Sequence, residues 1–356
     1  MKELFKKNKD TLITLGIVTG AYVLIEILLK AGAVSSLFKG LLVPLCSYII
    51  LAVSLNLTVG ILGELSLGHA GFMCIGAFTS AFFSKITVGV INPGWLRFVL
   101  AIIIGFFFAG LFGFLIGMPV LRLKGDYLAI VTLAFGEIIK NVINVLYIGR
   151  DSRGFHFSIK DSVSLGLEED GQMLINGAQG ITGTPKDSNF TAGFILIMIT
   201  LIIILNFIKS REGRAVMAIR DNVIAAESVG INVTRYKLLA FSLSAALAGV
   251  AGVLYSHNLN SLMATTKNFG YNMSIMILVF VVLGGIGSIR GSVISAIILT
   301  LLPELLRGLS NYRMLIYAIV LIAMMLFNWA PSARAFRERM VARLPFFKKK
   351  SAEKEV

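Results

Sequence analysis

Long apolar runs, separated by short polar or basic connections, dominate the chain. Most of them approach the ~20 residues that an α-helix needs to cross a bilayer. A helix on a soluble domain would show only an apolar stripe. The pattern therefore predicts an all-α, polytopic transmembrane helical bundle with about 8–10 spans. The candidate spans are Thr11–Leu29, Leu41–Leu62, Leu65–Ser84, Phe98–Met118, Tyr127–Ile148, Phe190–Ile208, Leu238–Ser256, Ser274–Gly287, Gly291–Leu306 and Met314–Trp329.

The eighth and ninth of these runs are short, and glycines interrupt them. Gly284, Gly285, Gly287 and Gly291 all fall where one run ends and the next begins. Irregular backbone at membrane depth is tolerated only where protein or a water-filled cavity surrounds it. This region is therefore expected to form a broken or re-entrant pair of helices, and a count of eight spans would also fit.

Composition supports the membrane interpretation and narrows the range of possible functions. Hydrophobic residues make up 56% of the 356, and charged residues only 15%, against ~25% in soluble domains. The net charge of +14 does not indicate nucleic-acid binding, because no soluble domain is left to carry a basic face. About two-thirds of the 33 Lys and Arg residues fall on the side of both termini, so both termini are expected in the cytoplasm.

Two connections are longer than the others. Residues 149–189 carry several acids and are expected outside, whereas the basic residues 209–237 are expected inside. In the inner connection Val216, Ile219, Val223, Ala226 and Gly230 share one face of a helix. Such an amphipathic helix either lies on lipid headgroups or docks into a groove of a cytoplasmic partner.

The motif Ile-Ala-Ala-Glu-Ser-Val-Gly at residues 224–230 resembles the EAA loop of ABC importer permeases. Its two alanines and the glycine match, whereas Ile224 replaces the first Glu and the downstream Leu-Pro is absent. Further stretches resemble the permeases for branched-chain amino acids, and they follow in the right order between about Leu41 and Trp329. These stretches are residues 65–72, 121–133, 213–220, 234–241 and 284–291.

The resemblance implies an importer built from two permease subunits, two cytoplasmic ATPase subunits and an extracytoplasmic substrate-binding protein. The extra first span and Gly125-Asp126-Tyr127-Leu128 are similar to the LivM-type subunit, whose partner would be a LivH-like permease. The expected location is the bacterial cytoplasmic membrane. The expected division is 1–40 for a basic tail and extra helix, 41–330 for the permease core, and 331–356 for a basic cytoplasmic tail.

The resemblance also favours docking over lipid contact for the inner connection. A continuous helix over 214–230 would then place its apolar stripe in an ATPase groove, and Gly230 would end it. The residues expected to couple the chain to the ATPase are Arg214, Arg220, Ala225, Ala226, Glu227 and Gly230. The outer connection is expected to help dock the binding protein.

Polar residues inside the spans are candidates for the translocation path, because charge in the bilayer is costly. Glu137, Lys140, Asn141 and Asn144 share one face of the fifth span. They either line a cavity that accepts an amino-acid zwitterion or form a helix–helix contact in which Glu137 and Lys140 neutralise each other. A second group lies in a glycine-rich break, which is either a cavity-lining segment or a tight turn. It comprises Glu64, Ser66 and His69.

No enzymatic motif accompanies these features. The chain has no phosphate-binding P-loop, no G-x-S-x-G elbow and no H-E-x-x-H zinc motif. Neither a cofactor nor a metal is expected, and ATP hydrolysis is assigned to a separate subunit. The expected function is import of leucine, isoleucine and valine. The alternatives are a urea or short-chain amide permease of the same architecture and an ion-coupled secondary transporter.

Overall fold

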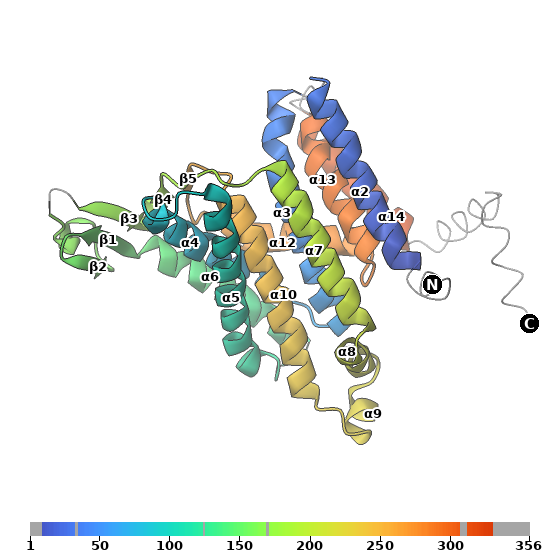
Figure 1. The fold of residues 1–356 in the computed structure, drawn as a ribbon. Coiled ribbons are helices and arrows are strands. Elements are labelled where there is room, and N and C mark those ends of the chain that lie inside the picture. Colours follow the sequence, from blue (N-terminus) through green and yellow to red (C-terminus); the bar gives the residue numbers. More distant parts are fainter. Residues whose placement is uncertain (1–8, 33–34, 124, 169–170, 307–311, 330–356) are drawn as a thin grey trace, which may run out of the picture.

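The computed structural model describes residues 9–32, 35–123, 125–168, 171–306 and 312–329. Within these residues the chain is mostly helical (Figure 1), which confirms the predicted polytopic helical bundle. The basic tails predicted at both ends lie largely outside the described residues. The long helices are α2 (Lys9–Lys30), α3 (Ser36–Asn56), α4 (His69–Thr87), α5 (Gly94–Val120), α6 (Asp126–Asn144), α7 (Phe190–Lys209), α10 (Val233–Ser256), α12 (Tyr271–Gly284), α13 (Ile289–Leu305) and α14 (Arg313–Trp329).

Each predicted span coincides with one of these helices, although some ends differ. Residues 65–68 were expected to begin the third span but are irregular, and β1 replaces the predicted end of the fifth. Six helical stretches in the described part of the chain are long and apolar enough to cross a membrane. They are Phe38–Leu62, His69–Thr87, Gly94–Val120, Phe190–Lys209, Val233–Ser256 and Thr266–Gly284.

The short elements lie at the ends of the long helices. The π-helix η1 extends α3, and α8 and α9 connect α7 to α10. In Figure 1, α8 lies at the lower end of α7, and α9 lies below α8. The short helices are η1 (Leu57–Leu62), α8 (Arg211–Asp221), α9 (Val223–Ser228), α11 (Thr266–Phe269), η2 (Val163–Leu165) and η3 (Gly177–Gln179).

The outer connection contains strands that the hydrophobic pattern did not predict. Three of them form an antiparallel sheet in the order β2-β1-β3, and β4 pairs with β5 after α10. The described part of this connection is therefore folded, and β3 and β4 contact α4. The strands are β1 (Tyr147–Asp151), β2 (Gly154–Ser158), β3 (Gln172–Asn176), β4 (Ile181–Thr182) and β5 (Ser261–Leu262).

Helix α10 lies at the centre of the core and packs against α3, α4 and α5. Its second half is fully buried and rich in Ala, Gly and Ser. Small side chains let membrane helices approach closely and pack by van der Waals contact. The peripheral helix α2 instead uses aromatic stacking on α7, with ring centroids of Tyr22 and Phe194 4.1 Å apart.

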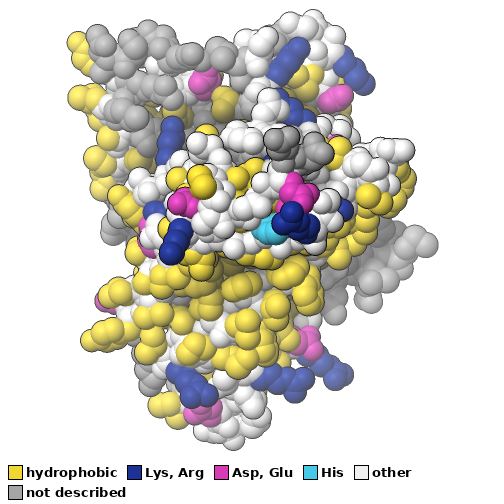
Figure 2. All heavy atoms as spheres, turned by 90° about the vertical axis from the view of Figure 1, so that its left-hand side faces the viewer, with side chains coloured by type: hydrophobic (Ala, Val, Ile, Leu, Met, Phe, Trp, Pro, Cys, Tyr) yellow, Lys and Arg dark blue, Asp and Glu magenta, His cyan; other side chains and the backbone are white. Residues whose placement is uncertain are grey.

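The face that carries the sheet shows how the chain meets a membrane. Figure 2 shows an apolar band with charged side chains gathered above and below it. Large apolar residues such as Ile103, Phe107, Ile130 and Ile138 are exposed on α5 and α6. A soluble protein would not expose so large an apolar surface, so this band suits lipid or a membrane-embedded partner.

Candidate functional site

The polar face of α6 brings together two of the predicted path residues. Lys140 donates to Glu137 over 2.5 Å, and its side chain is only 9% exposed. Lys140 also donates to the Thr266 hydroxyl over 3.0 Å, and the Tyr271 amide donates to Glu137 over 2.7 Å. The ion pair therefore fixes α6 to α11 and to the beginning of α12.

The two asparagines of the same face differ from each other. The Asn144 side chain donates to the Ala264 carbonyl over 3.0 Å and extends the contact with the segment ahead of α11. Asn141 lies on the exposed side of α6, between the exposed apolar residues Ile138 and Val142. Glu137, Lys140 and Asn144 thus form hydrogen bonds to other parts of the same chain, and the Asn141 amide lies on the surface of the bundle.

Glu64, Ser66 and His69 lie at the other end of α4 from the outer sheet. Glu64 forms an ion pair with Lys237 near the beginning of α10. His69 is buried, and its Nε2 lies 2.8 Å from the Ser54 hydroxyl. The Ser66 hydroxyl is buried and has no hydrogen-bond partner among the described residues. The predicted path residues therefore form two groups, one near each end of the bundle.

The inner connection is not one helix, so the prediction of a continuous helix over 214–230 is wrong. Helices α8 and α9 meet at Asn222, whose backbone is extended, with φ −158° and ψ 108°. Its side chain accepts a hydrogen bond from the Ala225 amide over 3.0 Å. Asparagine is favoured at such helix starts, because it satisfies a backbone donor that has no partner within the helix.

Three residues of the predicted apolar stripe are buried within the chain itself and two are exposed, so the expectation that the whole stripe fills an ATPase groove needs correction. Val216 and Ile219 are 0% exposed and Ala226 is 3% exposed. The apolar side chains that α9 and its end expose are Val223, at 40%, Ile224, at 77%, and Val229, at 76%. Periodicity therefore predicted the buried positions at Val216, Ile219 and Ala226 but not the exposure of Val223 and Gly230.

The remaining predicted coupling residues occupy different surroundings. Arg214 is exposed and donates to the Lys209 carbonyl over 2.7 Å. Arg220 instead faces the bundle and donates to the Gly60 carbonyl in η1 over 2.9 Å. Ala225 and Glu227 are exposed on α9, and Gly230 follows α9 with a left-handed φ of +83°.

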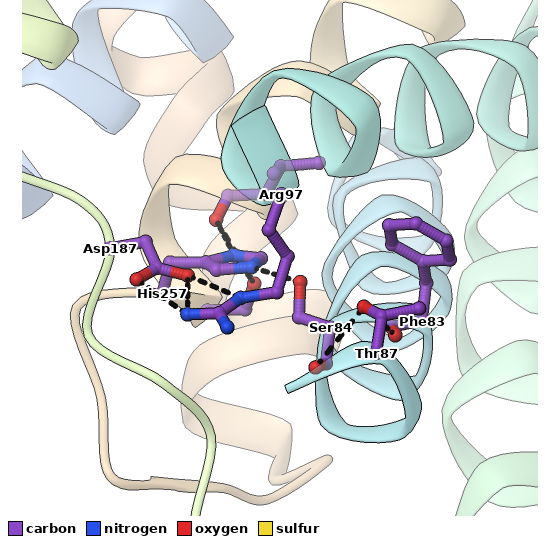
Figure 3. Close-up of polar contacts among 8 residues, drawn as sticks. Phe83, Ser84, Thr87, Arg97, Asp187 and His257 are labelled. Atoms are coloured by element: carbon purple, nitrogen blue, oxygen red, sulfur yellow. Dashed lines mark hydrogen bonds and ion pairs between the residues drawn. The ribbon is translucent and has the colours of Figure 1, made fainter. Parts of the chain in front are cut away.

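A buried network at the outer end was not predicted from the sequence (Figure 3). Arg97 at the beginning of α5 donates to both carboxylate oxygens of Asp187, over 2.7–2.9 Å. Beside them His257 contacts the Val253 carbonyl through Nδ1, over 2.9 Å, and the Ser84 hydroxyl through Nε2, over 2.8 Å. Since a carbonyl only accepts, Nδ1 is the donor. The ion pair holds the segment ahead of α7 against α5, and His257 joins the end of α10 to α4.

Comparison with known proteins gives a family match. The family model described as "Branched-chain amino acid transport system / permease component" matches residues 37–327. The high-affinity branched-chain amino acid transport system permease protein LivM of Escherichia coli K12 is 36% identical over 295 residues, or 80% of this chain. Its Salmonella typhimurium counterpart is 35% identical over the same length. The chain spans 66% of the length of each, slightly less than two-thirds.

The permease protein LivH of Escherichia coli K12, of the same high-affinity system, is also similar. It is 24% identical over 258 residues, which cover 71% of this chain and 79% of LivH. No solved structure matches the chain.

Proposed function

Because the chain belongs to the family of branched-chain amino acid transport system permease components, we propose that it is the LivM-type permease subunit of an ATP-driven importer in the bacterial cytoplasmic membrane. The substrates are leucine, isoleucine and valine. The observation that carries the proposal is the family match over residues 37–327, which includes nearly every membrane helix of this multi-pass chain. Its partners are a LivH-like permease, two cytoplasmic ATPase subunits and an extracytoplasmic binding protein.

The translocation path follows α6, where this chain meets the second permease. Glu137, Asn141 and Asn144 lie on the outer half of a helix whose exposed side is otherwise apolar. An amide facing lipid is unfavourable because lipid offers no hydrogen-bond partner. An aqueous path between two permeases gives Asn141 partners that the bilayer lacks. At the inner end the path passes the break that contains Glu64, Ser66 and His69.

Coupling to the ATPase uses the exposed side of α9. Ile224 and Val229 offer an apolar contact, and Ala225, Glu227 and Arg214 are exposed around it. Buried apolar anchors with a polar rim are typical of protein interfaces. Both termini and α9 lie in the cytoplasm, and the sheet of residues 149–189 meets the binding protein on the other side.

The first experiment is co-purification of the ATPase subunits followed by uptake of labelled leucine into proteoliposomes. Uptake should require ATP and the binding protein. Uptake of labelled urea but not leucine would favour the amide permease, and leucine uptake driven by an ion gradient without ATP would refute the importer.

The second experiment tests the docking side directly. Val229→Glu places a charge on the proposed contact and should abolish ATPase co-purification. Val90→Glu makes the same change at a residue that is 80% exposed in the connection between α4 and α5, and should leave co-purification unchanged. Equal retention of the ATPase by both variants would exclude α9 as the docking helix.

A further inference from the structure

Arg220 connects α8 to the π-helix that ends the first core span. Its Nη1 donates to the Gly60 carbonyl over 2.9 Å, and Nε and Nη2 donate to Asp221 Oδ1 over 3.1 and 2.9 Å. Asp221 therefore holds the planar guanidinium with one edge toward η1. The arginine belongs to the segment proposed to couple the ATPase, yet its charged end points into the permease.

The Gly60 carbonyl has a physical need for such a donor. The last carbonyls of any helix have no partner within the helix, and η1 ends at Gly63, whose φ of +80° turns the chain away. All six residues of η1 are buried, so few donors can reach this carbonyl. A cation near the carbonyl end of a helix is also favoured electrostatically.

On its other side Gly60 contacts the turn between α12 and α13. A Cβ added at Gly60 would lie 2.3 Å from the Gly287 nitrogen and 2.0 Å from Asn56 Oδ1. Asn56 accepts from the Gly287 amide over 2.8 Å and donates to Ser292 over 2.8 Å. The π-helix and the turn therefore touch backbone to backbone, and the hydrogen-bonded side chain of Asn56 holds the turn beside this contact.

We infer that Arg220 is a positioning residue that transmits the motion of α8 and α9 through η1 to the α12–α13 turn. Close-packed interiors transmit displacement instead of absorbing it. Single π-helical turns often occur at functional sites. A displacement of α8 first moves Gly60, through the hydrogen bond from Arg220 to the Gly60 carbonyl. The contact between Gly60 and Gly287 then moves the turn. This inference rests on the proposed function, since the motion originates in the ATPase.

The test measures leucine imported per ATP hydrolysed in proteoliposomes that contain the complete complex. Arg220→Gln should retain the ATPase subunits and hydrolyse ATP, but should import at least about tenfold less leucine per ATP, a change that corresponds to about 1.4 kcal/mol. Arg220→Lys keeps a charged donor and should recover part of that ratio. Arg211→Gln, an exposed position in the first turn of α8, should match the wild type.

A spin label at position 286, in the turn and 48% exposed as Ile286, supplies a second readout. Its spectrum should change on ATP binding in the wild type and stay unchanged in Arg220→Gln. Loss of ATPase binding in Arg220→Gln, or an unchanged ratio of leucine to ATP, would overturn the inference. Failure of the wild type itself to bind an ATPase would instead refute the proposed function.

Discussion

Replacing the Glu137–Lys140 pair with leucines separates its structural role from its transport role. In Glu137→Leu, Lys140 stays buried, with only the Thr266 hydroxyl as partner. Removing one partner of a buried ion pair costs ~3–5 kcal/mol, and the lower end applies because the hydroxyl remains. The Tyr271 amide also loses its acceptor. Glu137→Leu is therefore expected to lower the free energy of unfolding by about 3 kcal/mol.

The double variant Glu137→Leu, Lys140→Leu leaves no buried charge. Well-packed apolar residues often replace a buried pair at little or no cost. The Thr266 hydroxyl and the Tyr271 amide do lose partners, at a cost of ~1–3 kcal/mol for each donor that stays buried. The double variant should therefore be about as stable as Glu137→Leu or more stable. Its loss of unfolding free energy should be smaller than the summed losses of the two single variants by about 2–3 kcal/mol, which is the coupling free energy of the pair.

Denaturation of the purified variants in mixed micelles measures stability, and proteoliposome uptake measures transport. The path proposal predicts that the double variant does not recover leucine uptake even where its stability equals or exceeds that of Glu137→Leu, because an apolar face cannot solvate a zwitterion. Wild-type uptake by the double variant would refute the path along α6. Strictly additive losses of stability would refute the ion pair itself.

Three further predictions concern other parts of the fold. Gly60→Ala should lower stability by ~1–3 kcal/mol through overpacking and abolish uptake. Gly16→Ala should change neither, because a Cβ added at Gly16 meets no other atom within 4 Å. Thermal unfolding and uptake assays check both variants. Arg97→Met strands a carboxylate whose side chain is 13% exposed and should cost ~3–5 kcal/mol, seen as faster proteolysis ahead of α7. Burial raises the pKa of Asp151, but hydrogen bonds from a backbone amide and from His156 outweigh it and hold the pKa below 3.8. The stability that Asp151 contributes is complete above about pH 4 and is lost as the pH falls through the lowered pKa. The backbone amides of β1 and β2 should therefore lose protection against hydrogen exchange in that pH range, and the Asp151→Asn variant should show no such pH-dependent loss.

The helices were predictable because burial in a bilayer imposes long apolar runs that need no knowledge of neighbours. The glycines from Gly284 to Gly291 likewise indicated two short helices, which α12 and α13 are. The Glu137–Lys140 contact followed from spacing on one helix. All three are local properties of the chain.

Contacts between distant segments could not be predicted in this way. Arg97 and Asp187 are 90 residues apart, and nothing in either segment indicates the other. The stripe through Val216 and Ile219 predicted a buried face, but periodicity contains no information on whether that face meets the same chain or a partner. Asn222 carried a helix-start signal, which the continuing stripe concealed.

The bend at Asn222 divides the inner connection into α8, which packs on the core of the bundle, and α9, most of which is exposed. Because Val216, Ile219 and Arg220 anchor α8, substitutions at these three positions would disturb the membrane bundle. The exposed side of α9 carries no such constraint. Under the proposed docking of an ATPase on α9, its recognition can therefore diverge between related permeases by changes at Ile224 and Val229. Exchanging α9 between two permeases should exchange the ATPase that each recruits and leave substrate choice with the rest of the chain.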